Sequence, residues 1–147
     1  MSTIARPCRR LVLGTTLVAG ATALTACGDG SSAAPDNNPQ AIPDPSGKPL
    51  VVADAADLPV GSMVNVAREG SDDAYLLYRQ DEQTVLAYTS VCTHAGCQVG
   101  PGEGDFHCPC HNSHFSAEDG TATAGPARDA LTRYAAEVSD GKILLYP

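Results

Sequence analysis

Cysteine and histidine are concentrated in one short stretch of this chain of 147 residues. Four of the six cysteines and all four histidines fall within the 23 residues from 92 to 114. Two similar segments make up the stretch, Cys92-Thr-His-Ala-Gly-Cys97 and Cys108-Pro-Cys-His-Asn-Ser-His114. In each, a cysteine is followed by a histidine with one or two residues between them, which suits two adjacent metal positions, one with thiolate and one with imidazole ligands. The pattern therefore predicts a metal centre held by two tight loops.

Two other interpretations of these residues have to be compared with that one. A structural zinc site uses cysteine and histidine at similar spacings, but it needs four ligands and leaves the order Cys-Pro-Cys-His at residues 108–111 without a role. Two disulfides without a metal leave His94 and His111 unexplained. His107 and His114 stand outside the repeated pattern and are expected at the surface.

Short runs rich in β-forming residues follow one another from residue 50 to the end of the chain. The runs are 50–53, 63–68, 74–79, 84–91, 131–138 and 142–146. Gly, Asp and Ser turn signals separate them, and Ser139-Asp140-Gly141 marks a hairpin. Since no segment sustains a helical period, the sequence predicts an all-β fold, a small antiparallel sandwich over residues 50–147.

On the two Cys/His segments, the chain resembles the Rieske family of 2Fe-2S proteins, in the disulfide-containing type found in the iron–sulfur subunit of the cytochrome bc complex. The resemblance covers roughly residues 50–147 and implies a Rieske-type sandwich with two cluster-binding loops around one 2Fe-2S cluster. By position it implies four ligands, which are Cys92 and Cys108 for the inner iron and His94 and His111 for the outer iron.

The same resemblance assigns roles to residues around the ligands. Cys97 and Cys110 match a pair that forms a disulfide between the loops, a bond that persists in oxidising compartments. Ser113 matches a serine whose hydroxyl donates to a cluster sulfur and raises the reduction potential. Phe115 stands where high-potential members often carry tyrosine, so we expect a potential below the top of the class. Residues 125–127, which begin with Gly125 and Pro126, resemble a loop that covers the cluster.

The N-terminus has the features of an export signal. Residues 1–26 combine a basic start with an apolar run of 16 residues, which is short for a membrane span and typical of a signal peptide. The pair Arg9-Arg10 resembles a twin-arginine signal, which exports folded proteins. The run ends in Leu24-Thr-Ala-Cys27, which looks like a bacterial lipobox with Cys27 as the lipidated residue; a plain signal peptide cleaved nearby is the alternative.

Residues 27–49 are expected to form a disordered, lipid-anchored linker. They are rich in Pro, Asn, Asp and Ser and show no apolar periodicity, so they cannot bury a core. Such a segment either lets a carrier domain swing between partners or acts only as a spacer above the lipid headgroups.

The formal charge of −8 makes nucleic acid an unexpected partner, because phosphate contacts need Lys and Arg. The Rieske resemblance implies electron transfer, and the predicted lipid on Cys27 would hold the protein at the outer face of the cytoplasmic membrane. In that role the partners are a cytochrome b or c or another oxidoreductase subunit, with quinol as a candidate electron donor. The alternative is a stand-alone lipoprotein carrier, or a small subunit of another extracytoplasmic oxidoreductase. We expect a component of an oxidoreductase rather than a complete enzyme, and a non-redox binding module would contain no iron.

Overall fold

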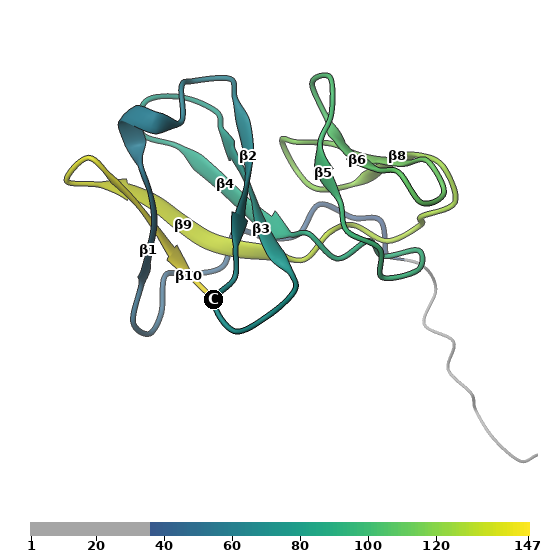
Figure 1. The fold of residues 1–147 in the computed structure, drawn as a ribbon, viewed down its shortest axis with the longest axis horizontal. Helices are drawn as coiled ribbons and strands as arrows, with labels where there is room; N and C mark the ends of the chain where they lie inside the picture. Colours follow the sequence, from purple (N-terminus) through teal and green to yellow (C-terminus); the bar gives the residue numbers. More distant parts are fainter. Residues whose placement is uncertain (1–35) are drawn as a thin grey trace, which may run out of the picture. The chain divides into compact units, whose positions relative to one another are not determined.

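The computed structural model describes residues 36–147. The predicted signal peptide, the arginine pair, the predicted lipidation site Cys27 and the first part of the predicted linker lie outside these residues. The described chain is nearly all β, as predicted, with one 3-10 helix and no α-helix among residues 36–147 (Figure 1). Correspondingly, this part of the chain contains no helix long and apolar enough to span a membrane.

Ten strands and the 3-10 helix η1 follow one another along the chain. They are β1 (Leu50–Asp54), η1 (Ala55–Asp57), β2 (Met63–Ala67), β3 (Ala74–Arg79), β4 (Val85–Thr89), β5 (Gly100–Pro101), β6 (Phe106–Cys108), β7 (Ser113–Phe115), β8 (Ala122–Ala124), β9 (Arg133–Ser139) and β10 (Lys142–Tyr146). Six strands form a large sheet in the order β1-β10-β9-β4-β3-β2, and four form a small sheet in the order β5-β6-β7-β8. Every pairing is antiparallel.

The strands of the large sheet confirm the predicted runs, and the hairpin signal explains one of their connections. Ser139 pairs with Lys142 across a two-residue turn formed by Asp140 and Gly141. Both turn residues have positive φ, 49° and 73°, as the tight turns between twisted antiparallel strands require. Asp and Gly adopt this conformation more readily than other residues, so the turn fixes the register of β9 and β10.

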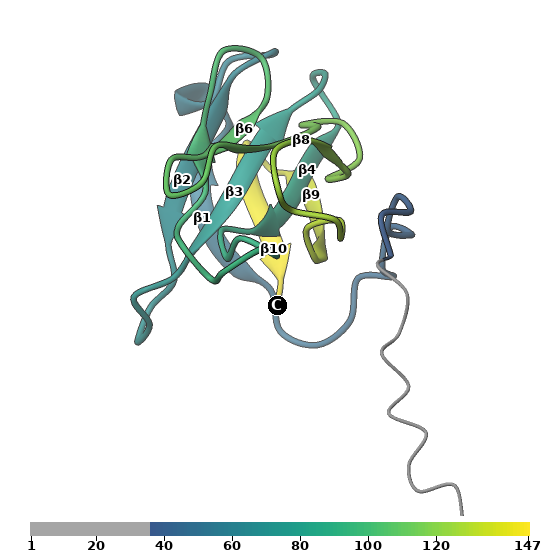
Figure 2. The same cartoon turned by 90° about the vertical axis from the view of Figure 1, so that its right-hand side faces the viewer.

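Strands β3 and β4 are buried on both faces, and this joins the two sheets. Leu76 of β3 and Leu86 and Tyr88 of β4 belong to a core shared with the small sheet. The residues next to them in sequence point to the opposite face of the large sheet, where they belong to a second hydrophobic core. Figure 2 shows the small sheet in front of these strands. Each fully buried apolar side chain contributes about 1.5–3 kcal/mol to folding, so this shared core holds the small sheet firmly on the large one.

The shared core also fixes the position of the metal-binding segments. Cys92 and Cys108 are members of it, together with Phe106 and Phe115 of the small sheet. Phe106 packs edge to face against Tyr88, with 5.7 Å between the ring centroids. The predicted site is therefore built directly on the packed junction of the two sheets.

Candidate metal centre

The first predicted loop lies between β4 and β5 and is closed by its own backbone. The amide of Cys92 donates to the carbonyl of Cys97 at 2.9 Å, and the amide of Gly96 donates to the carbonyl of Cys92 at 2.8 Å. A bridge between Val91 and Gln98 closes the base of the loop. These bonds hold Cys92 at the buried base of the loop and His94 at its exposed tip.

The second predicted loop connects β6 and β7. Cys108 pairs with Ser113, so the four residues between them form the turn. Asn112 has a φ of 58°, a left-handed conformation that asparagine tolerates better than most residues. The turn thus carries Cys108 at its buried start and His111 at its exposed side.

The structure brings the four predicted ligands together as two pairs. Cys92 and Cys108 are buried, with 3% and 1% of their surfaces exposed. Burial and, next, the neighbouring Cys92 thiol raise the pKa of the Cys108 thiol. The rings of His94 and His111 are both exposed and meet edge to face, with their centroids 4.7 Å apart.

This arrangement of donors differs from that of a mononuclear site. Among residues 36–147, no three His, Cys, Asp or Glu side chains converge on one point as a single metal ion requires. A binuclear cluster spreads its ligands instead, with two thiolates at one iron and two imidazoles at the other. The observed buried thiol pair and exposed imidazole pair fit that division.

A disulfide joins the two loops, as predicted. Cys97 and Cys110 are bonded, with their Cα atoms 6.4 Å apart. In the described part of the chain, the remaining cysteines are the buried pair Cys92 and Cys108. The bond links the end of the first loop to the middle of the second, so the two halves of the site are held together covalently.

Ser113 and Phe115 both point into the core from β7. Ser113 is fully buried, and its Oγ accepts a hydrogen bond from the amide of Ala127 at 3.2 Å. Because that bond uses an oxygen lone pair, the hydroxyl proton of Ser113 is free to be donated elsewhere. Phe115 is fully buried and offers no polar atom. The predicted tuning roles of both residues stay predictions.

The segment with Gly125 and Pro126 forms a third loop, which touches both of the others. Its backbone packs on the second loop at Gly125, which has a φ of 84°. In addition, the carbonyl of Asp129 accepts a hydrogen bond from Thr93 Oγ1 of the first loop at 2.8 Å. The predicted role of this segment as a cover stays a prediction, but its contacts with both metal-binding loops are established.

Several residues at the site carry no signal in the sequence analysis. Thr93 and Asp129 meet although they are 36 residues apart. His107 and His114, which were expected at the surface, are half-buried and stack on each other with their centroids 4.6 Å apart. His114 Nδ1 also lies 2.7 Å from Asp105 Oδ2. These two rings therefore form a separate pair beside the predicted ligands.

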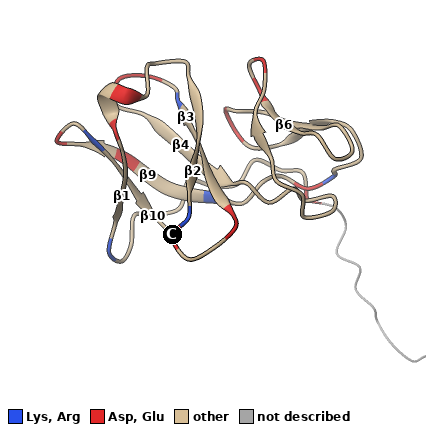
Figure 3. Cartoon of the chain, viewed as in Figure 1, with Lys and Arg blue, Asp and Glu red and all other residues tan. Residues whose placement is uncertain are grey.

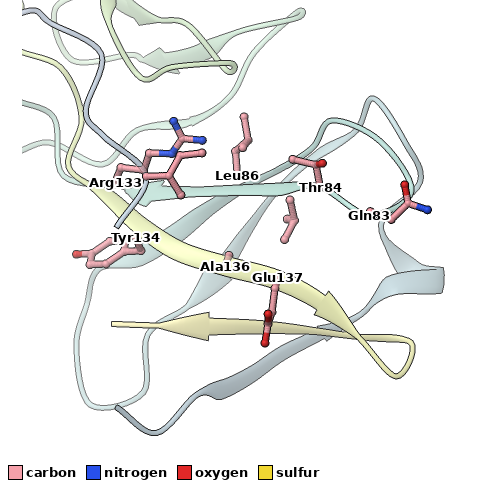
Figure 4. A pocket seen from close by; sticks show the side chains of 9 residues that line it. Gln83, Thr84, Leu86, Arg133, Tyr134, Ala136 and Glu137 are labelled. Atoms are coloured by element: carbon pink, nitrogen blue, oxygen red, sulfur yellow. The ribbon is translucent and has the colours of Figure 1, made fainter. Parts of the chain in front are cut away.

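The depression in Figure 4 lies elsewhere, in the large sheet. Strands β4 and β9 pair only at Ala87–Tyr134 and Tyr88–Arg133 and then diverge. The opening is lined by residues of both strands and of the turn before β4, among them Thr84, Leu86, Arg133, Tyr134, Ala136 and Glu137. None of the predicted ligands lines this depression, so it is separate from the candidate metal centre.

Comparison with known proteins points to one family. The model of the Rieske [2Fe-2S] domain matches residues 48–135. The cytochrome b6-f complex iron-sulfur subunit of Gloeobacter violaceus is 41% identical over 81 residues, which are 53% of this chain and 43% of that subunit. The chloroplastic subunit of Oryza sativa subsp. japonica is 40% identical over 80 residues, which are 52% of this chain and 35% of that protein. The chain thus spans less than half the length of these relatives.

Solved structures agree with this result. The cyanobacterial plasma membrane Rieske protein PetC3 from Synechocystis PCC 6803 is 31% identical, with a TM-score of 0.56 over 65% of this chain and 97% of that one. The ferredoxin of carbazole 1,9a-dioxygenase from Nocardioides aromaticivorans IC177 has a TM-score of 0.56 at 24% identity, over 69% of this chain and 99% of that one, and shares the fold. With the family model matching more than half of its residues, the chain belongs to the Rieske [2Fe-2S] domain family and binds one 2Fe-2S cluster.

Proposed function

We propose that the chain is an electron carrier in which Cys92 and Cys108 bind one iron of the cluster and His94 and His111 bind the other. One observation carries the proposal, namely that the two thiols are buried in the shared core while the two imidazoles are exposed. When bound, a 2Fe-2S cluster takes up and releases one electron at a time. Neutral imidazoles in place of two anionic thiolates favour the reduced state, so this ligand set gives a high potential for the class.

In this proposal the surrounding residues hold the ligands and exclude water. The Cys97–Cys110 disulfide keeps the two loops in register, and the shared core shields the thiol side. The exposed rings of His94 and His111 are the surface that a redox partner contacts. Their outward nitrogens also suit a hydrogen bond to the hydroxyl of a quinol, which makes quinol a candidate electron donor.

We further propose that the domain works at the outer face of the cytoplasmic membrane, held by a lipid on Cys27 and by the part of the predicted linker that precedes Asp36. The disulfide supports a compartment outside the cytoplasm, because such bonds are rare where thiols are kept reduced. The similarity to a plasma membrane Rieske protein supports a membrane location. Cleavage after residue 26 and twin-arginine export belong to the same proposal.

Charge favours a basic partner. Residues 90–132, which contain the three loops, carry five Asp and Glu (Glu103, Asp105, Glu118, Asp119 and Asp129) against a single Arg128. Figure 3 shows the same excess of acidic residues around the small sheet. An acidic surface around an exposed site steers a basic protein toward it, so we propose a basic cytochrome or oxidoreductase subunit as the acceptor.

A second candidate is a stand-alone carrier, or a small subunit of an oxidoreductase other than a cytochrome bc or b6-f complex. The acidic residues around the loops fit it equally well, because they suit a basic partner of either kind. The two candidates share the cluster and differ only in the partner.

The ligand set is tested by replacing each histidine. His94→Ala and His111→Ala should abolish the rhombic EPR signal of the reduced protein and lower its iron content. His114→Asn is the matched control, since His114 is a neighbouring histidine outside the proposed ligand set, and it should keep both. Retention of the signal in both alanine variants would refute the ligand assignment.

The partner is tested in membranes. If the chain serves a cytochrome bc-type complex, it should co-purify with cytochrome b after detergent extraction, and its deletion should abolish quinol–cytochrome c reductase activity. Normal reductase activity after deletion would exclude that role and leave the stand-alone carrier.

A further inference from the structure

Two residues from the predicted linker are bonded to both ends of residues 122–130, the segment that contains the third loop. The side-chain amide of Asn37 donates to the carbonyl of Ala122 at 3.0 Å and accepts from the amide of Ala122 at 2.6 Å. The backbone of Asp36 accepts from the amide of Ala130 at 3.1 Å and donates to Asp129 Oδ1 at 2.6 Å. We call residues 36 and 37 the clasp.

The bond pattern at Ala122 is that of a sheet neighbour. Ala122 begins β8, the edge strand of the small sheet, and edge strands leave backbone donors and acceptors without a partner strand. The amide of Asn37 takes the place of that strand by satisfying both backbone groups of one residue. The carboxylate of Asp36 in turn accepts from the amide of Asn38 at 3.2 Å, so the clasp residues are ordered by a local turn.

The clasp holds both ends of residues 122–130, and the metal-binding loops hold the middle. Between the two ends, the amide of Ala127 donates to Ser113 Oγ of the second loop. Close to the far end, Thr93 Oγ1 of the first loop donates to the carbonyl of Asp129. Asp129 is thus fixed from two sides, by the first loop at its carbonyl and by the clasp at its carboxylate.

We infer that Asp36 and Asn37 position the third loop against the two metal-binding loops, so that the segment leading into the domain also controls how closely the cluster is covered. The inference deepens the proposed function and rests on its ligand assignment. Asn37 is a positioning residue because it touches no proposed ligand and acts through residues 122–130.

The test uses the full chain with its cluster and the variant Asn37→Ala. Loss of the two bonds at Ala122 should speed amide exchange in peptides covering residues 123–130 by about tenfold. It should also speed the release of iron to a chelator severalfold and shift the reduction potential and the EPR g-values. A purely structural role of Asn37 would leave the potential and the g-values unchanged.

Two further variants complete the design. Gln80→Ala is the matched control, because it removes an exposed amide side chain that takes no part in the clasp, and it should have no effect. Asn37→Asp keeps the acceptor for the Ala122 amide but loses the donor, so its effects should be intermediate. If Asn37→Ala does not fold, the same measurements on Asn37→Asp test the inference.

The inference is overturned if residues 123–130 exchange at the wild-type rate in the Asn37 variants, or if exchange accelerates while iron release and potential stay unchanged. Failure of the proposed ligand set has another signature, which is an EPR signal that survives in the His94→Ala and His111→Ala variants. The two failures are therefore distinguishable.

Discussion

The backbone of Gly125 lies so close to that of Asn112 that there is no room for a side chain at position 125. A methyl group at Gly125 would overlap the carbonyl oxygen of Asn112 and lie 2.6 Å from the Cα of Ser113. This contact is what brings the third loop within hydrogen-bonding distance of Ser113.

Gly125→Ala should therefore destabilise the domain by at least about 2 kcal/mol, because a left-handed backbone alone costs roughly 1–2 kcal/mol and the overlap adds to it. Urea unfolding measures the effect. Gly104→Ala is the matched control, since Gly104 has a similar φ of 90° but open space around it. Equal losses in the two variants would show that the close approach contributes nothing.

Ser113→Ala should lower the reduction potential while the cluster is retained. A hydroxyl that donates to a cluster sulfur stabilises the more negative reduced state. Its loss should therefore lower the reduction potential by about 60 mV, the equivalent of roughly 1.4 kcal/mol for one electron. Redox titration followed by EPR measures the change. Ser116→Ala is the control, because Ser116 Oγ accepts only from the backbone amides of Glu118 and Asp119. An unchanged potential in Ser113→Ala would rule out the tuning role.

Removal of the disulfide between Cys97 and Cys110 should destabilise the domain. The bond between Cys97 and Cys110 closes a loop with a sequence separation of 13 residues, and loops of this length are worth about 3 kcal/mol in the chain-entropy account. The double variant Cys97→Ser/Cys110→Ser should unfold at a correspondingly lower denaturant concentration and lose iron faster. Wild-type protein reduced with a thiol is the control and should behave like the variant. A variant as stable as the oxidised wild type would contradict the structural role of the bond.

Tyr88→Phe should stabilise the domain by about 1 kcal/mol at neutral pH. Tyr88 is fully buried, and within residues 36–147 its hydroxyl has no hydrogen-bond partner. Tyr146→Phe is the contrasting control, because the Tyr146 hydroxyl donates to Glu137 at 2.8 Å and its loss should be neutral or slightly destabilising. Guanidinium unfolding of both variants makes the comparison, and destabilisation by Tyr88→Phe would point to an unrecognised partner of the hydroxyl.

The same tyrosine predicts a loss of stability at alkaline pH. Burial raises the pKa of Tyr88 to about 12, above the value of about 10 in an unfolded chain. The folded state therefore binds the phenolic proton more tightly, so this contribution is complete below pH 10 and disappears as the pH rises from 10 to 12. The stability of the wild type should fall by about 2 kcal/mol more than that of Tyr88→Phe over this interval. Parallel curves for the two proteins would show that Tyr88 does not titrate differently on folding.

The large sheet could be predicted from sequence because its strands follow local rules. β3 and β4 are rich in β-branched, aromatic and aliphatic residues, and Asp140-Gly141 is a strong local turn signal. The strands of the small sheet were missed. β5 has two residues and β6 to β8 have three each, which is too short for an alternation of polar and apolar residues to be recognised in the sequence.

The predicted metal centre also combines features set by local sequence with features set by long-range contacts. Cys92 to Cys97 and Cys108 to His114 are compact motifs, so their spacing predicts a metal centre, and the resemblance to the Rieske family adds the ligand set. The bond from Thr93 to Asp129 spans 36 residues and that from Asn37 to Ala122 spans 85. Such partners are ordinary polar residues without a local pattern, and only the folded backbone reveals that they meet.

His94 and His111 are exposed on one side of the site, and both thiols are enclosed on the other. This arrangement restricts how the electron donor and the electron acceptor can bind during turnover. Under the proposed ligand assignment, the donor and the acceptor have to use the same pair of rings. The two partners therefore exclude each other, and a ternary complex cannot form. Each cycle then requires the reduced domain to dissociate from the donor before it meets the acceptor. Steady-state rates should accordingly follow double-displacement kinetics, with inhibition by a high concentration of either partner.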